Sequence, residues 1–408
     1  MRANGRSFLG QPGLRFVVYI PVVPLRFPVL MCEGRWMLGE RIVFAGGGHA
    51  HLYSLARTQE LVRRGFDVTL VDRSPYLYYS GMATGVISGA YAPNEHRIDI
   101  RRLMEEGGGT FVEGRITDIR TENREFVLDS GRTVPYDAAS VCLGSEVPRS
   151  GVVENGAYAV GVKPVVNTVE IRRRLLTLAE DRAPRILVVG GGAAGCEVAA
   201  NALALLGRLG IRGGLTIAQG SGSLLPDASK RAQREILAFL QERGAKVLTS
   251  TLVTRIGDGV AWTSDGHEIP CDLPVLAVGV SPPDVFRDSR LPTDEAGGLR
   301  LDRYLRNAGD GRLFGGGDCV SFRGKSLPKL GVFAVRQGPV IFQNLQASLA
   351  GSPLHEYKPK KHYLYVLNLG DGTGLAVYGR LSWRGRLAWR LKHRIDERFV
   401  REHSRGRG

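Results

Sequence analysis

Short apolar runs recur along the chain, each followed by a polar or glycine-rich segment. Four of them are residues 41–45, 67–71, 185–189 and 214–218. Runs of this length are typical of strands buried on both faces of a parallel sheet. Helix-forming sequence follows the first and third runs, over 52–64 and from 196 onward. The alternation predicts an α/β fold in which a similar unit recurs about 144 residues later.

The first apolar run leads into a glycine-rich loop. Gly46, Gly48 and His51 occupy the three glycine positions of a G-x-G-x-x-G fingerprint. Glycines let the backbone turn tightly and approach a pyrophosphate, whose charge meets the N-terminus of the following helix. Asp72 ends the next strand, 21 residues beyond His51, the place of the acid that accepts hydrogen bonds from a ribose. We predict an FAD site here, and interpret His49 and His51 as packing residues, not as proton-transfer or metal-binding groups.

The third apolar run leads into a second copy of the fingerprint. Gly190, Gly192 and Gly195 fill all three of its glycine positions. Two such loops in one chain predict two dinucleotides, a flavin and a nicotinamide. The strand that should carry the second ribose-binding acid ends in Gln219 instead. A glutamine can hydrogen-bond a ribose but does not repel a 2′-phosphate, so the choice between NAD and NADP stays open.

Further segments resemble the strands that close nucleotide-binding domains. Residues 134–145 and 271–280 each combine a turn, a buried strand and a glycine-containing exit. Later, Gly317 and Asp318 follow a strand, where the ribityl chain of a flavin would need a hydrogen-bond acceptor.

Taken together, these motifs resemble the two-dinucleotide flavoprotein oxidoreductases related to pyridine nucleotide-disulfide reductases. Within that superfamily the chain is most similar to type II NADH dehydrogenases and to the NADH-dehydrogenase-like flavoproteins associated with selenide, water dikinase. The resemblance covers roughly residues 39 to 400. The segments that carry it are 45–52, 79–82, 190–197, 316–318 and 328–338.

The resemblance implies two Rossmann-like domains, an FAD domain in two segments with an NAD(P) domain inserted, and a C-terminal membrane or dimer segment. A chain of 408 residues has room for this arrangement. The expected parts are an extension over 1–37, the FAD domain at 38–150 and 270–348, the NAD(P) domain at 151–269, and a basic amphipathic segment at 349–408.

The resemblance also assigns candidate catalytic residues. Glu197 matches the family's glutamate after the second fingerprint and is expected near the nicotinamide. Lys329 precedes a predicted helix over 332–345, whose N-terminus would stabilise the reduced flavin. The expected cofactor-binding residues are Gly46, Gly48, His51, Asp72, Arg73, Ser80, Gly81, Gly144, Gly317, Asp318, Gln337, Gly190, Gly192, Gly195, Gln219 and Gly279.

Positive charge is concentrated at the two ends of the chain. Of the net charge of +15, residues 356–408 contribute +8 and residues 1–36 contribute +4. If 384–400 is helical, it carries an apolar row beside a basic row. The rows are Leu387, Leu391, Ile395 and Phe399, and Arg386, Arg390, Arg394 and Arg398. Such a helix suits an anionic membrane surface, although it could also pack on its own protein or on a second subunit. No nucleic-acid motif accompanies the charge.

The first residues and the cysteines add two constraints. Prolines and arginines interrupt the apolar stretches of 1–37, which we interpret as a disordered or spurious extension; a basic leader is the alternative. The five cysteines form no Cys-x-x-Cys pair, which excludes a dithiol relay of that kind. Cys142 and Cys319 fall on segments expected near the flavin, so a sulfide-oxidising use of the pair stays open beside simple packing.

We therefore predict a cytoplasmic flavoprotein, peripheral on the inner face of the cell membrane, that passes electrons from NAD(P)H through FAD to a quinone. One alternative is a sulfide- or selenium-compound:quinone oxidoreductase, which would need Cys142 or Cys319. Another is a redox partner or sensor with a decayed nicotinamide site, which the neutral Gln219 keeps open. A homodimer is compatible with each.

Overall fold

The computed structural model describes residues 39–147, 153–154, 159–211, 214–323 and 327–404. The extension expected over 1–37 lies outside these residues. None of the helices described is long and apolar enough to cross a bilayer.

The first large sheet is parallel and gathers strands from distant parts of the chain. Its order is β20-β9-β1-β2-β5. The strands are β1 (Arg41–Ala45), β2 (Asp67–Asp72), β5 (Thr110–Glu113), β9 (Ala138–Val141) and β20 (Leu313–Gly315). Ile42 to Ala45 are at most 1% exposed, so the strand is buried on both faces of the sheet. The sequence placed β1 at the correct residues and β2 to within one.

The second large sheet repeats this arrangement in the order β11-β18-β12-β13-β14. Its strands are β11 (Val160–Gly161), β12 (Ile186–Val189), β13 (Leu215–Gln219), β14 (Lys246–Thr249) and β18 (Leu273–Leu276). β18 falls in the segment 270–348 that the sequence assigned to the FAD domain, yet it pairs with β12. The chain therefore returns to the first sheet after β18, not before it.

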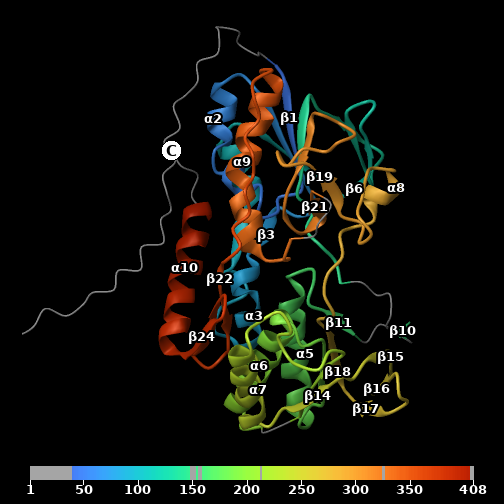
Figure 1. The fold of residues 1–408 in the computed structure, drawn as a ribbon, viewed down its shortest axis with the longest axis vertical. Helices are drawn as coiled ribbons and strands as arrows, with labels where there is room; N and C mark the ends of the chain where they lie inside the picture. The colour runs from blue at the N-terminus through green and yellow to red at the C-terminus, as the bar shows by residue number, and fades with distance from the viewer. Residues whose placement is uncertain (1–38, 148–152, 155–158, 212–213, 324–326, 405–408) are drawn as a thin grey trace, which may run out of the picture. The chain divides into compact units, whose positions relative to one another are not determined.

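The helices connect these strands and close the sheets (Figure 1). The helix predicted over 52–64 is broken into α1 (Leu52–Leu55) and α2 (Thr58–Arg63). The Thr58 hydroxyl donates to the Leu55 carbonyl oxygen at 2.9 Å, a local bond that competes with a continuous helix. The other helices are α3 (Ser80–Ser88), α4 (Ile100–Glu106), α5 (Asn167–Asp181), α6 (Ala193–Arg208), α7 (Lys230–Glu242), α8 (Val285–Asp288), the 3₁₀ turn η1 (Gly317–Cys319) and α9 (Gly331–Leu349).

The chain also forms several smaller sheets besides the two large parallel ones. They are β3 (Tyr76–Tyr78) with β4 (Arg97–Asp99); β6 (Ile116–Arg120), β7 (Glu125–Leu128) and β8 (Thr133–Pro135); β10 (Val153–Glu154), β15 (Val253–Gly257), β16 (Val260–Thr263) and β17 (Glu268–Pro270); and β19 (Leu299–Leu301) with β21 (Val320–Phe322).

The C-terminal segment is a three-stranded antiparallel sheet followed by one helix. The sheet contains β22 (Leu364–Asn368), β23 (Gly374–Tyr378) and β24 (Leu381–Gly385), and the helix is α10 (Arg386–Ser404). α10, in red in Figure 1, packs on this sheet and on β4 through Ala388, Lys392 and Asp396, which are all buried. The predicted apolar row is turned outward at Leu387 and Ile395, which are 74% and 38% exposed.

Candidate functional site

The first glycine loop packs directly on the end of β9. A Cβ atom added at Gly46 would lie 2.5 Å from the Cys142 carbonyl oxygen, and one at Gly48 would lie 2.4 Å from the Cys142 Sγ. Gly46 also has a φ of +86°, which glycine adopts without strain. The loop therefore tolerates no side chain at these positions, as the fingerprint requires.

The His51 side chain hydrogen-bonds to the backbone of this loop. Its ring is fully buried, with Nδ1 at 2.5 Å from the Gly46 carbonyl oxygen and Nε2 at 2.8 Å from the Ser140 Oγ. Burial lowers the pKa of His51 to about 4, so the ring is neutral at pH 7. Because a carbonyl only accepts, Nδ1 carries the proton and Nε2 accepts from the Ser140 hydroxyl. This geometry fits the packing interpretation of His51.

The residues at the ends of β2 and β13 make the same contact in the two units. Asp72 Oδ2 accepts from the Gly47 backbone N–H at 2.6 Å, and Gln219 Oε1 accepts from the Gly191 N–H at 2.7 Å. Asp72 also accepts from Ser74 N–H through Oδ1, at 2.9 Å. A carboxylate has about four acceptor positions, so Asp72 keeps capacity for ribose hydroxyls. Arg73 follows it directly in the chain.

The second glycine loop is built like the first and is open where a phosphate would lie. A Cβ atom at Gly190 would come within 2.3 Å of the Ala277 carbonyl oxygen, and one at Gly195 within 1.9 Å of the Gly190 carbonyl oxygen. At Gly192, which caps α6, it would meet no atom of the described chain within 4 Å. Gly144 and Gly279, after β9 and β18, are similarly open and have φ values of +74° and +103°.

The start of α9 faces the first loop. A Cβ atom at Gly331 would lie 3.7 Å from His49 Cδ2 and 3.8 Å from Ser80 Oγ. From the next turns of α9, Gln337 Oε1 accepts from the Gly317 N–H at 2.7 Å. The structure thus brings together four elements that are far apart in the sequence: the first loop, α3, η1 and α9.

Asp318 and Lys329 lie at η1, but in different settings. The Asp318 carboxylate accepts from the Ser145 hydroxyl at 3.1 Å, and its Oδ2 lies 3.8 Å from Lys163 Nζ. Lys329 Nζ donates to the backbone carbonyls of Asp318 and Val320, at 2.6 and 3.4 Å. The Lys329 ammonium is therefore tied to the backbone of η1, where it fixes the turn that carries Asp318.

Glu197 is half-buried where α6 meets the C-terminal sheet. Its Oε1 accepts from the Asn368 N–H at 2.6 Å. Burial raises the pKa of Glu197 to about 7, against the opposing effects of Lys392 and of the Asn368 hydrogen bond. A carboxyl group that titrates near neutrality inside the protein is a common property of functional sites.

Sequence reasoning did not single out the buried ion pair on α10. Lys392 Nζ donates to Asp396 Oδ2 at 2.7 Å and to the Gly81 carbonyl oxygen at 2.5 Å. The Tyr79 hydroxyl donates to Asp396 Oδ1 at 3.0 Å. The pair therefore holds α10 against the first turn of α3 and the residue before it. The i, i+4 spacing of Lys392 and Asp396 was visible in the sequence, but nothing local distinguishes this pair from an exposed one.

Aromatic rings complete this contact. Phe399 stacks on Tyr79 with ring centroids 4.6 Å apart, and on His49 at 6.3 Å. Burial lowers the pKa of His49 to about 4, and its Nε2 has no hydrogen-bond partner among the residues that the structure describes. The end of α10 thus covers His49, beside the first glycine loop and the start of α9.

The two candidate redox cysteines are packed inside the protein. Cys142 and Cys319 are at most 3% exposed. Burial raises the pKa of Cys142 well above its ordinary value and that of Cys319 to about 11. Because the thiolate is the reactive form, neither residue has the setting of a nucleophilic cysteine. The geometry favours the packing role.

The donor sets fit two dinucleotides. Each loop leaves backbone N–H groups at the start of a helix, where a pyrophosphate is stabilised. Asp72 fits an adenosine ribose in the first unit, and the amide of Gln219 takes the same place in the second. In the first unit, Gln337 contacts Gly317, the neighbour of Asp318, and Ser80 lies beside Gly331, so these residues are available to hold the rest of an FAD molecule.

A family model described as pyridine nucleotide-disulphide oxidoreductase matches residues 40–338. The demethylphylloquinone reductase NdbB of Synechocystis is 27% identical to this chain, over 83% of it and 87% of the relative. The type II NADH:quinone oxidoreductase Ndh of Mycobacterium tuberculosis is 25% identical, over 86% of the chain and 82% of the relative.

Solved structures agree on the fold. The sulfide:quinone oxidoreductase of Aquifex aeolicus superposes with a TM-score of 0.79 at 15% identity, over 90% of this chain and 92% of the other. NDH2 of Plasmodium falciparum in complex with NADH gives a TM-score of 0.75 at 16% identity, over 88% and 96%.

Proposed function

Because the chain belongs to the pyridine nucleotide-disulphide oxidoreductase family, we propose that it is an FAD-dependent NAD(P)H dehydrogenase that reduces a quinone. The observation that carries this proposal is the pair of dinucleotide loops built alike, each seated on the exit of a buried strand and each bonded to the residue that ends the next strand. Relatives named as quinone reductases match more than four-fifths of the chain and support the acceptor class.

FAD, when bound, would supply the hydride and electron transfer. The residues of the chain would bind and orient the cofactor and the nicotinamide, and donate a proton to the acceptor. Gly46, Gly48 and Asp72 hold the adenosine and phosphate half, while Asp318 and Gln337 define the other end. Lys329 acts on the site by fixing η1 through the carbonyls it binds, and the α9 N-terminus contributes its positive dipole.

Glu197 is the proposed proton donor. Reduction of a quinone by NADH consumes one proton from the medium: quinone, NADH and H⁺ give quinol and NAD⁺. A carboxyl group with a pKa of about 7 holds a proton for part of the time at neutral pH and can release it to a neighbouring oxygen. Lys392 of α10 lies near enough to Glu197 to influence its pKa, so the proposed proton donor and the buried ion pair of α10 are neighbours.

We also propose that α10 rests on an anionic membrane surface, at the inner face of the cell membrane. Five large apolar side chains of β23, β24 and α10 are exposed: Tyr378, Leu381, Trp383, Leu387 and Ile395. Arg386, Arg390, Arg394 and Arg398 line the same helix, all exposed. An apolar surface with a basic border fits the headgroup layer, where a quinone is also found. The alternative is that a second copy of the chain covers this surface.

The test is the anaerobic absorbance of the bound flavin after mixing with NADH, NADPH or sulfide in turn, followed by a soluble quinone. Rapid bleaching by one nicotinamide and recovery on adding quinone are expected, and the faster nucleotide identifies the donor. Bleaching by sulfide alone would replace the proposal with a sulfide oxidoreductase. No bleaching by any donor would favour a redox partner or sensor. Cys142→Ala and Cys319→Ala variants should react like the wild type.

A further inference from the structure

A pocket lies beside residues 310–312, at the N-terminal end of β20, whereas the first dinucleotide loop follows the C-terminal end of β1. The pocket has a volume of about 360 Å³, and its lining includes Arg124, Arg306, Arg312, Asp310 and Ser348. Arg312 comes directly before β20, whose other end leads into Gly316 and Gly317. From Gly331 to Leu349, α9 spans about 27 Å. Its first turn lies beside the first glycine loop, and its last turn lines this pocket.

Three arginines and one acid line this pocket, and the acid is already engaged. Asp310 Oδ2 accepts from the Tyr136 hydroxyl at 2.8 Å, and Oδ1 accepts from the Arg312 backbone N–H at 2.8 Å. Arg306 Nε donates to Asp302 at 3.2 Å. The carboxyl end of α9 adds about half a negative charge. The lining therefore keeps an excess of positive charge.

One guanidinium group has an unmet donor. Arg312 Nη1 is buried and has no hydrogen-bond partner in the described part of the chain. A buried N–H that bonds to nothing costs about 1–3 kcal/mol. A small rotation of this side chain toward an oxyanion in the pocket would give that nitrogen a partner.

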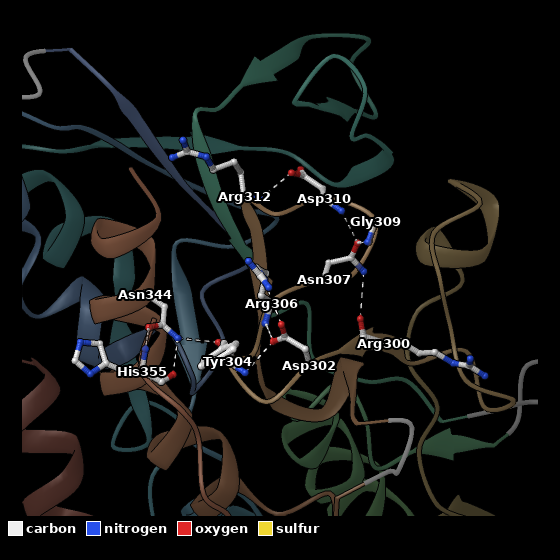
Figure 2. Close-up of polar contacts among 10 residues, drawn as sticks. All are labelled: Arg300, Asp302, Tyr304, Arg306, Asn307, Gly309, Asp310, Arg312, Asn344 and His355. Atoms are coloured by element: carbon white, nitrogen blue, oxygen red, sulfur yellow. Dashed lines mark hydrogen bonds and ion pairs between the residues drawn. The ribbon is translucent and has the colours of Figure 1, made fainter. Parts of the chain in front are cut away.

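The walls of the pocket are held rigidly by buried polar side chains (Figure 2). Asn307, which is 1% exposed, accepts from the Gly309 and Asp310 N–H groups through its Oδ1. Asn344 is fully buried and joins the loop to the segment after α9, donating to the carbonyl oxygens of Tyr304 and His355 at 2.8 and 2.9 Å. Arg306 and Arg312 are thus carried on a loop whose backbone is fixed without a ligand, which lowers the entropy cost of binding one.

From this arrangement we infer that the pocket binds a phosphate-bearing small molecule no larger than a mononucleotide. Guanidinium groups bind phosphate oxygens through paired hydrogen bonds. Arg306 already pairs with Asp302, so Arg124 and Arg312 are the groups expected to bind a phosphate or pyrophosphate. The volume lies at the lower end of the range for small-molecule sites. The inference does not depend on the electron donor or acceptor.

The experiment measures binding of inorganic phosphate, pyrophosphate and AMP to the FAD-loaded protein by titration calorimetry, with saturating NAD⁺ present to fill the second dinucleotide loop. We expect one of the three to bind, with a Kd that rises at least tenfold in Arg312→Gln and in Arg124→Gln. The best probe among them separates a free phosphate or pyrophosphate from a nucleotide.

The matched control is Arg300→Gln. Arg300 lies on β19, whose backbone is hydrogen-bonded to Asn307, and it is exposed, with its side chain pointing away from the cluster in Figure 2. The Arg300→Gln substitution removes the same charge and should leave the Kd of the bound probe within twofold of the wild-type value. Equal weakening by Arg300→Gln would show that only overall charge matters and would overturn the inference. So would the lack of measurable binding of all three probes to the wild type, or binding that Arg312→Gln and Arg124→Gln leave unchanged. Flavin absorbance of each variant checks that it is folded.

Discussion

Asp72 and Gln219 hold equivalent positions but differ in charge, and this sets the expected nucleotide preference. Each accepts a hydrogen bond from the second residue of its glycine loop. We expect Gln219→Glu to raise the Kd for NADPH about tenfold while leaving NADH within twofold, because a carboxylate there repels a 2′-phosphate by about 1–2 kcal/mol. Titration followed by tryptophan or nicotinamide fluorescence measures the Kd for each nucleotide. Gln241→Glu, exposed on α7, adds the same charge elsewhere. Equal effects on both nucleotides would contradict the argument.

Glu197 should make stability depend on pH. Its pKa is raised to about 7 in the folded protein from an ordinary value of 4.5. The folded state therefore binds the proton more tightly, and the resulting stabilisation is fully present below about pH 4.5 and lost as pH rises through 7. The shift corresponds to about 3 kcal/mol.

The corresponding variant is Glu197→Gln. We expect the free energy of unfolding of the wild type, relative to this variant, to fall by about 2.5 kcal/mol between pH 5 and pH 8. Urea denaturation at the two pH values measures it. Glu180→Gln, at an exposed position of α5, is the control. A difference between wild type and Glu197→Gln that stays constant with pH would mean that Glu197 does not titrate in this window.

At the scale of elements, α10 depends on one buried ion pair. The Lys392 and Asp396 side chains are 9% and 5% exposed. Removing only one partner leaves a buried charge, which costs about 3–5 kcal/mol. We expect Lys392→Met to lower the unfolding free energy by that amount and to release flavin, whereas Lys392→Met/Asp396→Leu recovers most of the loss. Arg390→Met, exposed on the same helix, should be nearly silent. If the double variant were as unstable as the single one, the pair would matter through contacts other than its charges.

The elements that the sequence placed well are those set by local pattern. β1, β12 and the two glycine loops follow from an apolar run that ends in glycine, and both features lie within a few residues. The break between α1 and α2 depends on one threonine hydroxyl, which pattern alone does not weigh. The position of Glu197 depends on Asn368 and Lys392, more than 170 residues later, and a single sequence does not show which distant segments meet.

At the scale of the whole molecule, residues 356–408 contribute +8 of the net charge of +15, and the exposed apolar side chains of β23, β24 and α10 lie in the same segment. Each arginine near an anionic bilayer contributes about 1 kcal/mol, so Arg390→Gln/Arg394→Gln should weaken vesicle binding about 30-fold. Flotation with vesicles of anionic and of neutral lipid measures this. Arg63→Gln/Arg234→Gln changes the net charge equally on other helices and should bind as the wild type does. Equal binding to neutral vesicles, or a concentration-dependent dimer that the Arg390→Gln/Arg394→Gln variant abolishes, would favour a second copy of the chain as the occupant.

The contact of α10 with the start of α3 also affects the order of events during synthesis. Phe399, Lys392 and Asp396 reach the flavin end of the molecule from the last described helix. These residues leave the ribosome after both dinucleotide domains have emerged. This side of the coenzyme site is therefore closed only after α10 has been synthesised, and a chain that ends before Lys392 is expected to be colourless when purified.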